Sequence, residues 1–305
     1  MVKECFSFCS GSAELNAVVW KPEGEITAIL QITHGMTEHI DRYQDFAEAL
    51  VGKGILVAGF DLRGHGRNPG SLECASFGEH GWEASLQDMY LFSLHLQQLF
   101  PGVPHYMLGF SLGSFLLREY LGIHPEGITG AIIAGSGQQP GWLLGIMMTI
   151  VKGQLKKCGW DGTTDLVKKL SFGVYNDKFK PNRTEADWLC SDNAQLDEYI
   201  ADPLCRKTIS AGLFYQLLSS MKRTCAVSSY DGWNKNLPVL LLSGDRDPVG
   251  DLGKGIAAVE KTMAKAGLTS VTRRSFPGAR HDLFHEKDSG TADAVIGAIL
   301  SWMKK

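Results

Sequence analysis

A serine set between glycines behind a short apolar run could serve as a nucleophile. Residues 109–113 read Gly-Phe-Ser-Leu-Gly, with Ser111 at the centre, and they follow the apolar run 105–108. In this G-x-S-x-G pattern the serine occupies a tight turn between a strand and a helix, where glycine neighbours leave its Oγ free to project above the sheet. The pentapeptide alone also fits an ordinary turn. The pentapeptide marks a nucleophile only if the chain also contains the oxyanion donors, the acid and the base of an acyl-transfer serine in the expected order.

The oxyanion of an acyl-transfer intermediate needs two backbone N–H donors. Residues 34–39 read His-Gly-Met-Thr-Glu-His and follow a predicted strand over 26–33. The glycine permits a sharp turn, which we expect to direct the N–H of Met36 toward the serine. The N–H of Leu112, at the first turn of the next helix, would be the second donor. Two histidines of this segment lie five residues apart, but no further ligand clusters with them in a recognised spacing, so no metal site is predicted.

The acid that orients the base is expected after a late strand. Residues 237–243 form a continuous apolar run, as in a buried parallel strand, and lead into Gly-Asp-Arg-Asp-Pro-Val. Asp247 is favoured, because it lies a few residues beyond the strand end and a turn-forming residue follows it. Asp245 is its main rival and could instead be a solvated turn residue or a partner of Arg246. Asp251 lies too far along the chain.

The general base is expected after the last strand, which we place over 270–276. That strand leads through Pro-Gly-Ala-Arg to His281, our candidate base. His285 follows four residues later, on what we expect to be the start of the final helix, and is interpreted as a surface residue. The oxyanion loop, serine, aspartate and histidine therefore occur in the order that an α/β serine hydrolase requires.

Taken together, these segments resemble the monoacylglycerol lipase and lysophospholipase branch of the α/β-hydrolases. The motifs that carry the resemblance are residues 34–39 with Arg42-Tyr43, Asp-Leu-Arg-Gly-His-Gly at 61–66, and residues 109–113, 244–248 and 278–281. The matching motifs span nearly the whole chain. The resemblance implies that Ser111 is the nucleophile, Asp247 the acid and His281 the base, with Met36 and Leu112 as oxyanion donors. These roles agree with the order and spacing above.

Strands alternate with helices along the chain, which predicts an α/β fold: the α/β-hydrolase fold, with a mostly parallel, doubly wound sheet of about eight strands. The expected strands are an opening hairpin of 4–9 and 14–20, then 26–33, 55–60, 105–108, 129–134, 237–243 and 270–276; helices are expected over 41–51, capped by Asp41, and over 82–100. Active-site loops should gather at the carboxyl ends of the strands.

A helical cap is predicted where this alternation stops. About a hundred residues between Ala134 and Leu237 hold several helical patterns and no convincing strand. We therefore expect a cap or lid over 138–235, inserted after the sixth strand into a core of 1–137 and 236–305. The cap's segment 142–151 is apolar on nearly all sides, too hydrophobic for a helix with one solvent face. It would pack between cap and core, line an acyl-chain pocket or make transient contact with a membrane surface.

Composition excludes several function classes. The 305 residues carry 30 Lys plus Arg against 33 Asp plus Glu with no large basic run, so nucleic acid is not an expected partner. Seven cysteines form no C-x-x-C pair and are odd in number, which favours reduced thiols and a cytoplasmic location. We expect no signal peptide and no membrane span. The composition gives no sign of an oligomeric state.

The predicted function is hydrolysis of a medium- or long-chain acyl ester, a small molecule or lipid, by two-step acyl transfer without a cofactor. An amidase, peptidase or thioesterase on the same core is the alternative within the hydrolases. Epoxide and haloalkane hydrolysis are disfavoured, because those enzymes usually place aspartate where Ser111 stands. A non-catalytic binding protein is the rival of another class.

Overall fold

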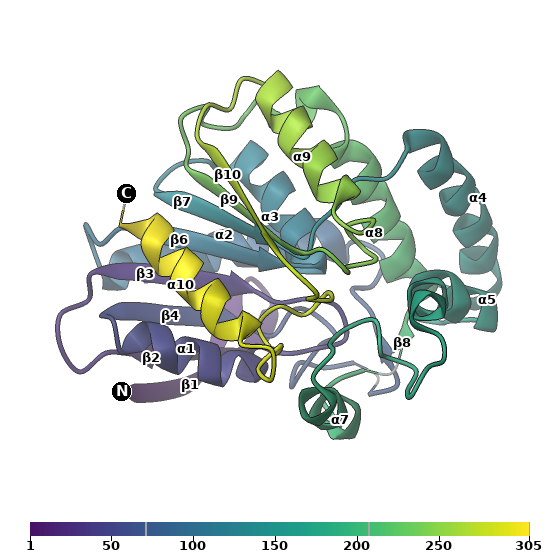
Figure 1. The fold of residues 1–305 in the computed structure, drawn as a ribbon, viewed down its shortest axis with the longest axis horizontal. Helices are drawn as coiled ribbons and strands as arrows, with labels where there is room; N and C mark the ends of the chain where they lie inside the picture. Colours follow the sequence, from purple (N-terminus) through teal and green to yellow (C-terminus); the bar gives the residue numbers. More distant parts are fainter. Residues whose placement is uncertain (71, 207, 305) are drawn as a thin grey trace.

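The computed structural model describes residues 1–70, 72–206 and 208–304, and an eight-stranded sheet forms its centre (Figure 1). In spatial order the strands are β1 (Val2–Ser10), β2 (Ala13–Lys21), β4 (Ile55–Phe60), β3 (Ala28–Thr33), β6 (His105–Phe110), β7 (Gly130–Ala134), β9 (Val239–Gly244) and β10 (Val271–Phe276). Only the pairs β1–β2 and β2–β4 are antiparallel within this sheet of the described chain. The predicted mostly parallel sheet is confirmed.

The register of the central strands aligns their carboxyl ends. Thr33 at the end of β3 pairs with Gly109 of β6, and Phe110 pairs with Ala134 of β7. Ala134 in turn pairs with Leu242 of β9. Every residue of β3, β4, β7 and β9 is buried, as expected of parallel strands covered on both faces. The loops after these strands therefore emerge at one edge of the sheet.

Helices cover both faces of the sheet and create two apolar cores (Figure 1). One face packs against α1 (Gln44–Val51) and α10 (Thr291–Met303); the other packs against α2 (Gly81–Leu99), α3 (Leu112–Ile123) and α9 (Lys254–Lys265), and α8 (Ala211–Thr224) joins this second core by packing on α3. Neighbouring strand residues enter opposite cores: Ile29 of β3 joins the α2 side, whereas Leu30 joins the α1 side. This alternation follows from the period of two in a strand.

Two local expectations are wrong. A two-residue strand, β8 (Thr208–Ile209), lies in the region expected to hold none and pairs with β5 (Cys74–Ala75). So short a strand has no hydrophobic periodicity to detect. The helix expected from residue 41 is a 3₁₀ turn, η1 (Ile40–Tyr43), and α1 begins at Gln44. Asp41 caps nothing, because its carboxylate pairs with Lys3 and Arg67.

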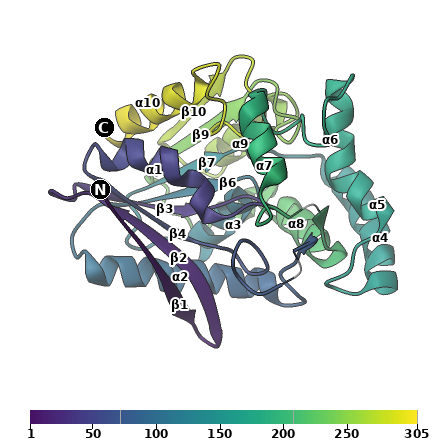
Figure 2. The ribbon, with the colours of Figure 1, turned by 90° about the horizontal axis from the view of Figure 1, so that it is seen from below.

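The chain between β7 and β9 gathers at the end of the molecule away from both termini (Figures 1 and 2). We refer to residues 138–235 as the insertion. Its further elements are α4 (Gly141–Cys158), α5 (Asp165–Lys168), a π-turn η2 (Lys169–Gly173), α6 (Val174–Asn176), η3 (Asp177–Phe179), α7 (Asn193–Ala201) and η4 (Val227–Tyr230). Among the described residues, no helix is both long and apolar enough to cross a membrane.

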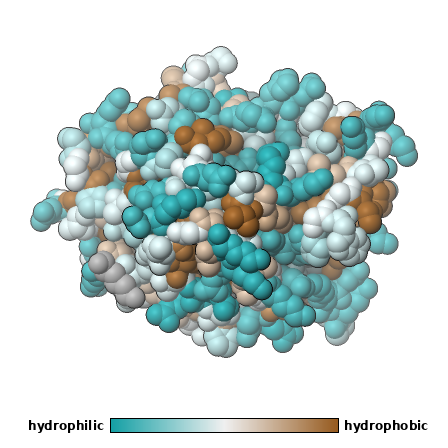
Figure 3. All heavy atoms as spheres, turned by 90° about the horizontal axis from the view of Figure 1, so that it is seen from above, coloured by the Kyte–Doolittle hydropathy of each residue, from teal (hydrophilic) through white to brown (hydrophobic). Residues whose placement is uncertain are grey.

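The apolar residues of helix α4 are only partly enclosed, which departs from packing between cap and core, one of the three roles expected for segment 142–151. Trp142, Ile146 and Ile150 are 70%, 52% and 39% exposed, and their spacing of four places them on one face. Only Leu144 and Val151 of α4 are fully buried. The face shown in Figure 3 is largely hydrophilic, with apolar side chains in separate small patches. Scattered exposed apolar residues are ordinary on protein surfaces, whereas these three share one face of one helix.

Candidate active site

Ser111 occupies a strained turn between β6 and α3. Its backbone angles are φ +49° and ψ −115°, a conformation that costs a non-glycine residue about 1–3 kcal/mol. The turn is tight because glycines flank it. A Cβ on Gly109 would lie 2.4 Å from the carbonyl oxygen of Gly113, and one on Gly113 would lie 2.0 Å from that of Thr33. The glycine spacing read from the sequence therefore has a direct steric cause.

The three predicted residues form a continuous hydrogen-bonded relay. The Oγ of Ser111 lies 2.9 Å from Nε2 of His281, and Nδ1 of His281 lies 3.0 Å from Oδ1 of Asp247. The three residues are 8%, 1% and 0% exposed. A carboxylate can only accept, so Nδ1 donates to Asp247 and Nε2 is left to accept the serine hydroxyl. This is the arrangement in which imidazole can remove the serine proton.

The rival aspartates lie elsewhere. Asp247 is fully buried, and its Oδ1 also accepts the N–H of Val249 at 2.8 Å. Asp245 is half-buried and accepts the N–H of Gly278 at 2.8 Å, so it joins the loop after β9 to the turn that precedes the histidine. Asp251 lies further along the chain than Asp247, and its backbone has a left-handed conformation. Of the three, the structure brings only Asp247 to His281.

The two predicted oxyanion donors border the serine with free amide groups. Leu112 is the first residue of α3, where backbone N–H groups have no partner within the helix. Met36 lines the cavity at Ser111 together with His281. Within the described chain no acceptor takes the N–H of Met36 or of Leu112. Both amides are therefore free to bind an oxygen at the serine.

Glu38 shapes the loop that carries Met36, a task that our sequence analysis did not assign to it. One carboxylate oxygen accepts the N–H of Gly35 at 2.6 Å and the hydroxyl of Tyr43 at 3.0 Å. The other oxygen pairs with Arg42. Burial raises the pKa of Tyr43 well above its usual value, so this phenol remains a donor. The buried carboxylate thus holds the loop from both ends.

Arg42 joins this loop to the one that carries His281. Its guanidinium reaches Asp282, the residue after the candidate base, at 3.1 Å. His285 also belongs to this network, with Nδ1 at 2.9 Å from Asp282 and Nε2 at 3.0 Å from the carbonyl oxygen of Arg42. The expectation of a surface residue at a helix start is wrong. His285 is 8% exposed, and α10 begins only at Thr291.

The histidines of the early loop have structural partners. His34 donates from Nδ1 to the carbonyl oxygen of Gly35 at 2.8 Å and accepts the N–H of Leu62 on Nε2 at 2.9 Å. Burial lowers the pKa of His34 to about 3, so its ring is neutral at pH 7. Both ring nitrogens are occupied, which leaves none for a metal.

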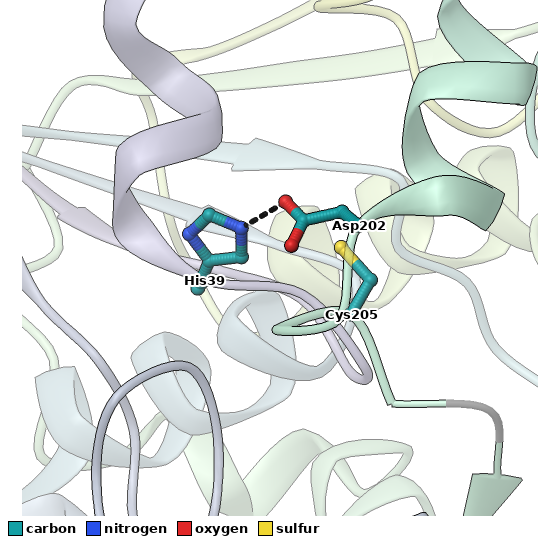
Figure 4. Close-up of side chains that lie close together, drawn as sticks. All are labelled: His39, Asp202 and Cys205. Atoms are coloured by element: carbon teal, nitrogen blue, oxygen red, sulfur yellow. Dashed lines mark hydrogen bonds and ion pairs between the residues drawn. The ribbon is translucent and has the colours of Figure 1, made fainter. Parts of the chain in front are cut away.

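His39 lies with Asp202 and Cys205 from the end of α7 (Figure 4), and their ligand atoms are all within 4.8 Å of one another. Imidazole, carboxylate and thiolate are zinc ligands. Here, however, Nε2 of His39 bonds directly to Asp202 at 2.7 Å. Burial also raises the pKa of the Cys205 thiol, which opposes the thiolate a metal needs. The cluster is best described as a hydrogen-bonded contact that ties the early loop to the insertion.

The insertion covers the serine closely. The cavity at Ser111 has a volume of only about 20 Å³. Its insertion-side wall consists of Phe172, Trp188, Leu189 and Tyr199, which also line a neighbouring groove of about 760 Å³. No sequence motif pointed to these residues, because they come together from separate segments of the insertion.

Tyr199 connects the insertion to the loop of Met36. Its hydroxyl lies 2.7 Å from the Oγ1 of Thr37, the residue after Met36. Thr37 has a left-handed backbone, with φ +60°. The ring of Tyr199 lies 5.0 Å from the guanidinium of Arg42. The insertion therefore contacts both sides of the loop that carries a candidate oxyanion donor.

Known hydrolases are similar to this chain over nearly its full length. The family model for serine aminopeptidase, S33, matches residues 24–288. The chain is 27% identical to the human monoglyceride lipase, with 94% of this chain and 85% of that protein aligned. It is 22% identical to the monoacylglycerol lipase of Mycolicibacterium smegmatis, over 93% and 91% of the two chains. The crystal structure of a thermostable carboxyl esterase from Bacillus coagulans superposes with a TM-score of 0.86 at 25% identity, covering 100% of this chain and 98% of that one.

Proposed function

The chain belongs to the serine aminopeptidase S33 family of hydrolases, and from this premise we propose that it hydrolyses medium- or long-chain acyl esters such as monoacylglycerols or lysophospholipids. The relatives named monoglyceride lipase and carboxyl esterase support an ester as the scissile bond. The relay of Ser111, His281 and Asp247, with bonds of 2.9 and 3.0 Å, is the observation that carries the proposal.

The first chemical step acylates the serine. His281 removes the hydroxyl proton of Ser111 as Oγ attacks the ester carbonyl carbon, and Asp247 holds the imidazole in the required tautomer. The N–H groups of Met36 and Leu112 bind the oxyanion of the tetrahedral intermediate. His281 then gives its proton to the leaving alcohol. The acyl group remains on Ser111 as an ester.

The second step releases the acid. Water enters after the alcohol leaves, and His281 takes its proton as the hydroxide attacks the acyl carbon. The same two amides bind the second oxyanion. Collapse of this intermediate returns the proton to Ser111 and frees the carboxylic acid. The residues involved require no cofactor for either step.

The walls of the serine cavity support an amphiphilic substrate. Glu38, Arg42 and Asp282 form one charged wall, whereas Phe172 and Trp188 contribute apolar surface from the insertion. A substrate with a hydroxylated or polar alcohol and an apolar acyl chain matches both. We propose accordingly that the insertion acts as a cap over the core, and that its aromatic wall contacts the acyl chain.

Helix α4 supports a transient contact between this cap and a lipid surface. Trp142, Ile146 and Ile150 present an exposed apolar row. Lys152, and Lys156 with Lys157 in the last turn, add positive charge along the same helix. An exposed apolar face flanked by lysines is typical of helices that lie in a membrane interface. Such a contact would bring a lipid ester to the cap.

Labelling with a fluorophosphonate tests the proposed nucleophile, because only an activated serine reacts with it. We expect the wild-type protein to be labelled and Ser111→Ala to remain unlabelled, with ester hydrolysis lowered by several orders of magnitude and an unchanged melting temperature. Retained activity in purified Ser111→Ala would refute the mechanism. Absence of labelling in the wild type would favour a non-catalytic binding protein.

A panel of substrates separates esters from the other acyl bonds. Comparing kcat/KM for p-nitrophenyl esters from acetyl to palmitoyl, monoacylglycerol and lysophosphatidylcholine with that for matched amides and thioesters identifies the scissile bond. We expect longer acyl esters to be preferred, because each buried methylene contributes about 0.8 kcal/mol. Faster cleavage of an amide or thioester would instead select one of the alternative hydrolases.

A further inference from the structure

The imidazole of His281 is in contact with two aromatic rings as well as its two hydrogen-bond partners. Phe110, at the end of β6, has its ring centroid 5.0 Å away with an interplanar angle of 37°. Trp188, from the insertion, has its ring centroid 5.1 Å away at 31°. The mechanism uses both ring nitrogens, but neither aromatic contact.

Trp188 stands on a segment fastened to the loop of His281. The carbonyl oxygen of Leu189 accepts the N–H of Asp282 at 2.7 Å. Arg280 donates to the carbonyl oxygens of Asp187 and Cys190 on either side. The residues directly before and after His281 therefore bond to the residues around Trp188. These bonds keep the two segments, and so the two residues, next to each other.

The indole is held from the insertion side as well. The backbone N–H of Trp188 donates to Oδ1 of Asn176 at 3.1 Å, which fixes the chain at this residue. Its ring stacks on Phe172 with centroids 5.7 Å apart at 22°, and the ring of Tyr175 lies 5.2 Å away. Trp188 is almost fully buried. A ring fixed on so many sides can hold a neighbouring imidazole in one orientation.

The chemical step places a positive charge beside this indole. His281 becomes an imidazolium when it takes the proton of Ser111, and it is 1% exposed, so bulk water does not solvate that charge. Asp247 offsets the charge at one edge of the ring. The negative π-face of tryptophan attracts cations within about 6 Å of its centroid, and most strongly when both are desolvated. Trp188 meets these conditions.

We propose that Trp188 is a positioning residue for the general base: it orients His281 and stabilises the imidazolium formed during acyl transfer. The inference rests on the proposed function and adds that the insertion takes part in the chemistry, not only in substrate binding. It follows that an acetyl ester, too short to use an acyl-chain site, still depends on Trp188.

Replacement of the ring by aliphatic and aromatic side chains tests the proposal. With p-nitrophenyl acetate, we expect Trp188→Leu to lower kcat about tenfold, equivalent to about 1.4 kcal/mol, with KM nearly unchanged. Trp188→Phe keeps a π-face and should recover most of the lost kcat. A role in packing alone predicts no such difference between the two apolar replacements. If Trp188→Leu does not fold, Trp188→Met, which fills irregular space, replaces it.

Trp160→Leu is the matched control, because this indole also comes from the insertion but packs on Tyr215, with ring centroids 6.4 Å apart, and does not line the serine cavity. We expect it to keep the wild-type kcat. A wild-type kcat in Trp188→Leu, or equal losses in the Leu and Phe variants, would overturn the inference. Fluorophosphonate labelling separates the two levels: an unlabelled wild type refutes the proposed function itself, whereas equal labelling rates of wild type and Trp188→Leu refute only the role of Trp188.

Discussion

The core side and the insertion side of the serine cavity are built by different kinds of interaction. On the core side, strand ends, close glycine contacts and a buried relay fix Ser111 and His281. On the insertion side, Trp188 reaches His281 through a ring contact, and Tyr199 reaches Thr37 through a hydrogen bond between hydroxyls. Backbone geometry therefore places the relay, whereas side-chain packing brings the insertion against it.

The largest expected effect lies on the core side. Asp247→Asn should lower kcat about 10⁴-fold, because the amide favours the wrong tautomer of His281. Asp245→Asn is the matched control and should cost far less, since Asp245 bonds only to a backbone N–H outside the relay. Steady-state kinetics on one p-nitrophenyl ester measures both. If Asp245→Asn is the more damaging change, the acid has been assigned to the wrong residue.

Arg42 lies where the two sides meet, so its loss should have the next largest effect. Arg42→Met leaves Glu38 and Asp282 without their buried cation, and breaking such a pair costs about 3–5 kcal/mol. Urea denaturation gives this change in unfolding free energy. Arg223→Met, which removes an exposed arginine paired with Glu119, should cost no more than about 1 kcal/mol. Equal losses of unfolding free energy in Arg42→Met and Arg223→Met would mean that the Arg42 network does not stabilise the fold.

The core side could be predicted because its geometry is local in sequence. Gly109 and Gly113 are required by contacts within a few residues of Ser111 or with the end of β3. Strand order then brings Asp247 and His281 to the same edge of the sheet. Each of these requirements leaves a short motif behind a strand. Sequence reasoning therefore found the relay and its chain order.

The insertion side could not be predicted for the opposite reason. Trp188 and Tyr199 reach the site from a region without strand periodicity, and their partners lie 93 and 162 residues away in His281 and Thr37. The burial of His285 escapes local patterns for a related reason, because Nε2 of this histidine bonds to the carbonyl oxygen of Arg42, 243 residues away in the chain. Contacts between segments that are distant in the chain produce no short sequence motif.

Acid conditions should weaken the core side through two buried histidines. Burial lowers the pKa of His34 and of His65 from 6.5 to about 3. Between these values the unfolded chain binds protons that the folded chain does not, so stability is full above about pH 6.5 and falls as the pH decreases. At pH 5 the loss should be roughly 2 kcal/mol for each histidine.

Urea denaturation at pH 7.5 and pH 5 measures this decrease. His65→Asn removes one titrating ring and should reduce the loss of stability between pH 7.5 and pH 5 by about 2 kcal/mol, whatever it does to the stability at pH 7.5. Protonation of His34 would also break its bond from the N–H of Leu62. If the free energy of unfolding stays constant from pH 7.5 to pH 5, folding does not lower the pKa of either ring.

The smallest effect on stability should come from the outer face of α4, where an exposed and a buried residue of one helix can be compared directly. Ile146 is 52% exposed whereas Leu144, two residues earlier on the same helix, is fully buried. Ile146→Gln should therefore change the unfolding free energy by no more than about 0.5 kcal/mol. Leu144→Gln should cost about 2–5 kcal/mol, because it removes buried apolar volume and adds a buried amide.

If the exposed row of α4 binds a membrane surface, Ile146→Gln should weaken lipid binding more than Leu144→Gln does. Co-sedimentation with phosphatidylcholine vesicles should show about tenfold weaker binding for Ile146→Gln, since a buried aliphatic side chain contributes about 1.5–3 kcal/mol and only part of it enters the interface. Hydrolysis of a dissolved acetyl ester should not change, because Ile146 lies outside the serine cavity. Unaltered vesicle binding in Ile146→Gln and in Trp142→Gln would remove the membrane contact from the proposed function. The relay and the role of Trp188 would still stand, because neither depends on how the substrate arrives.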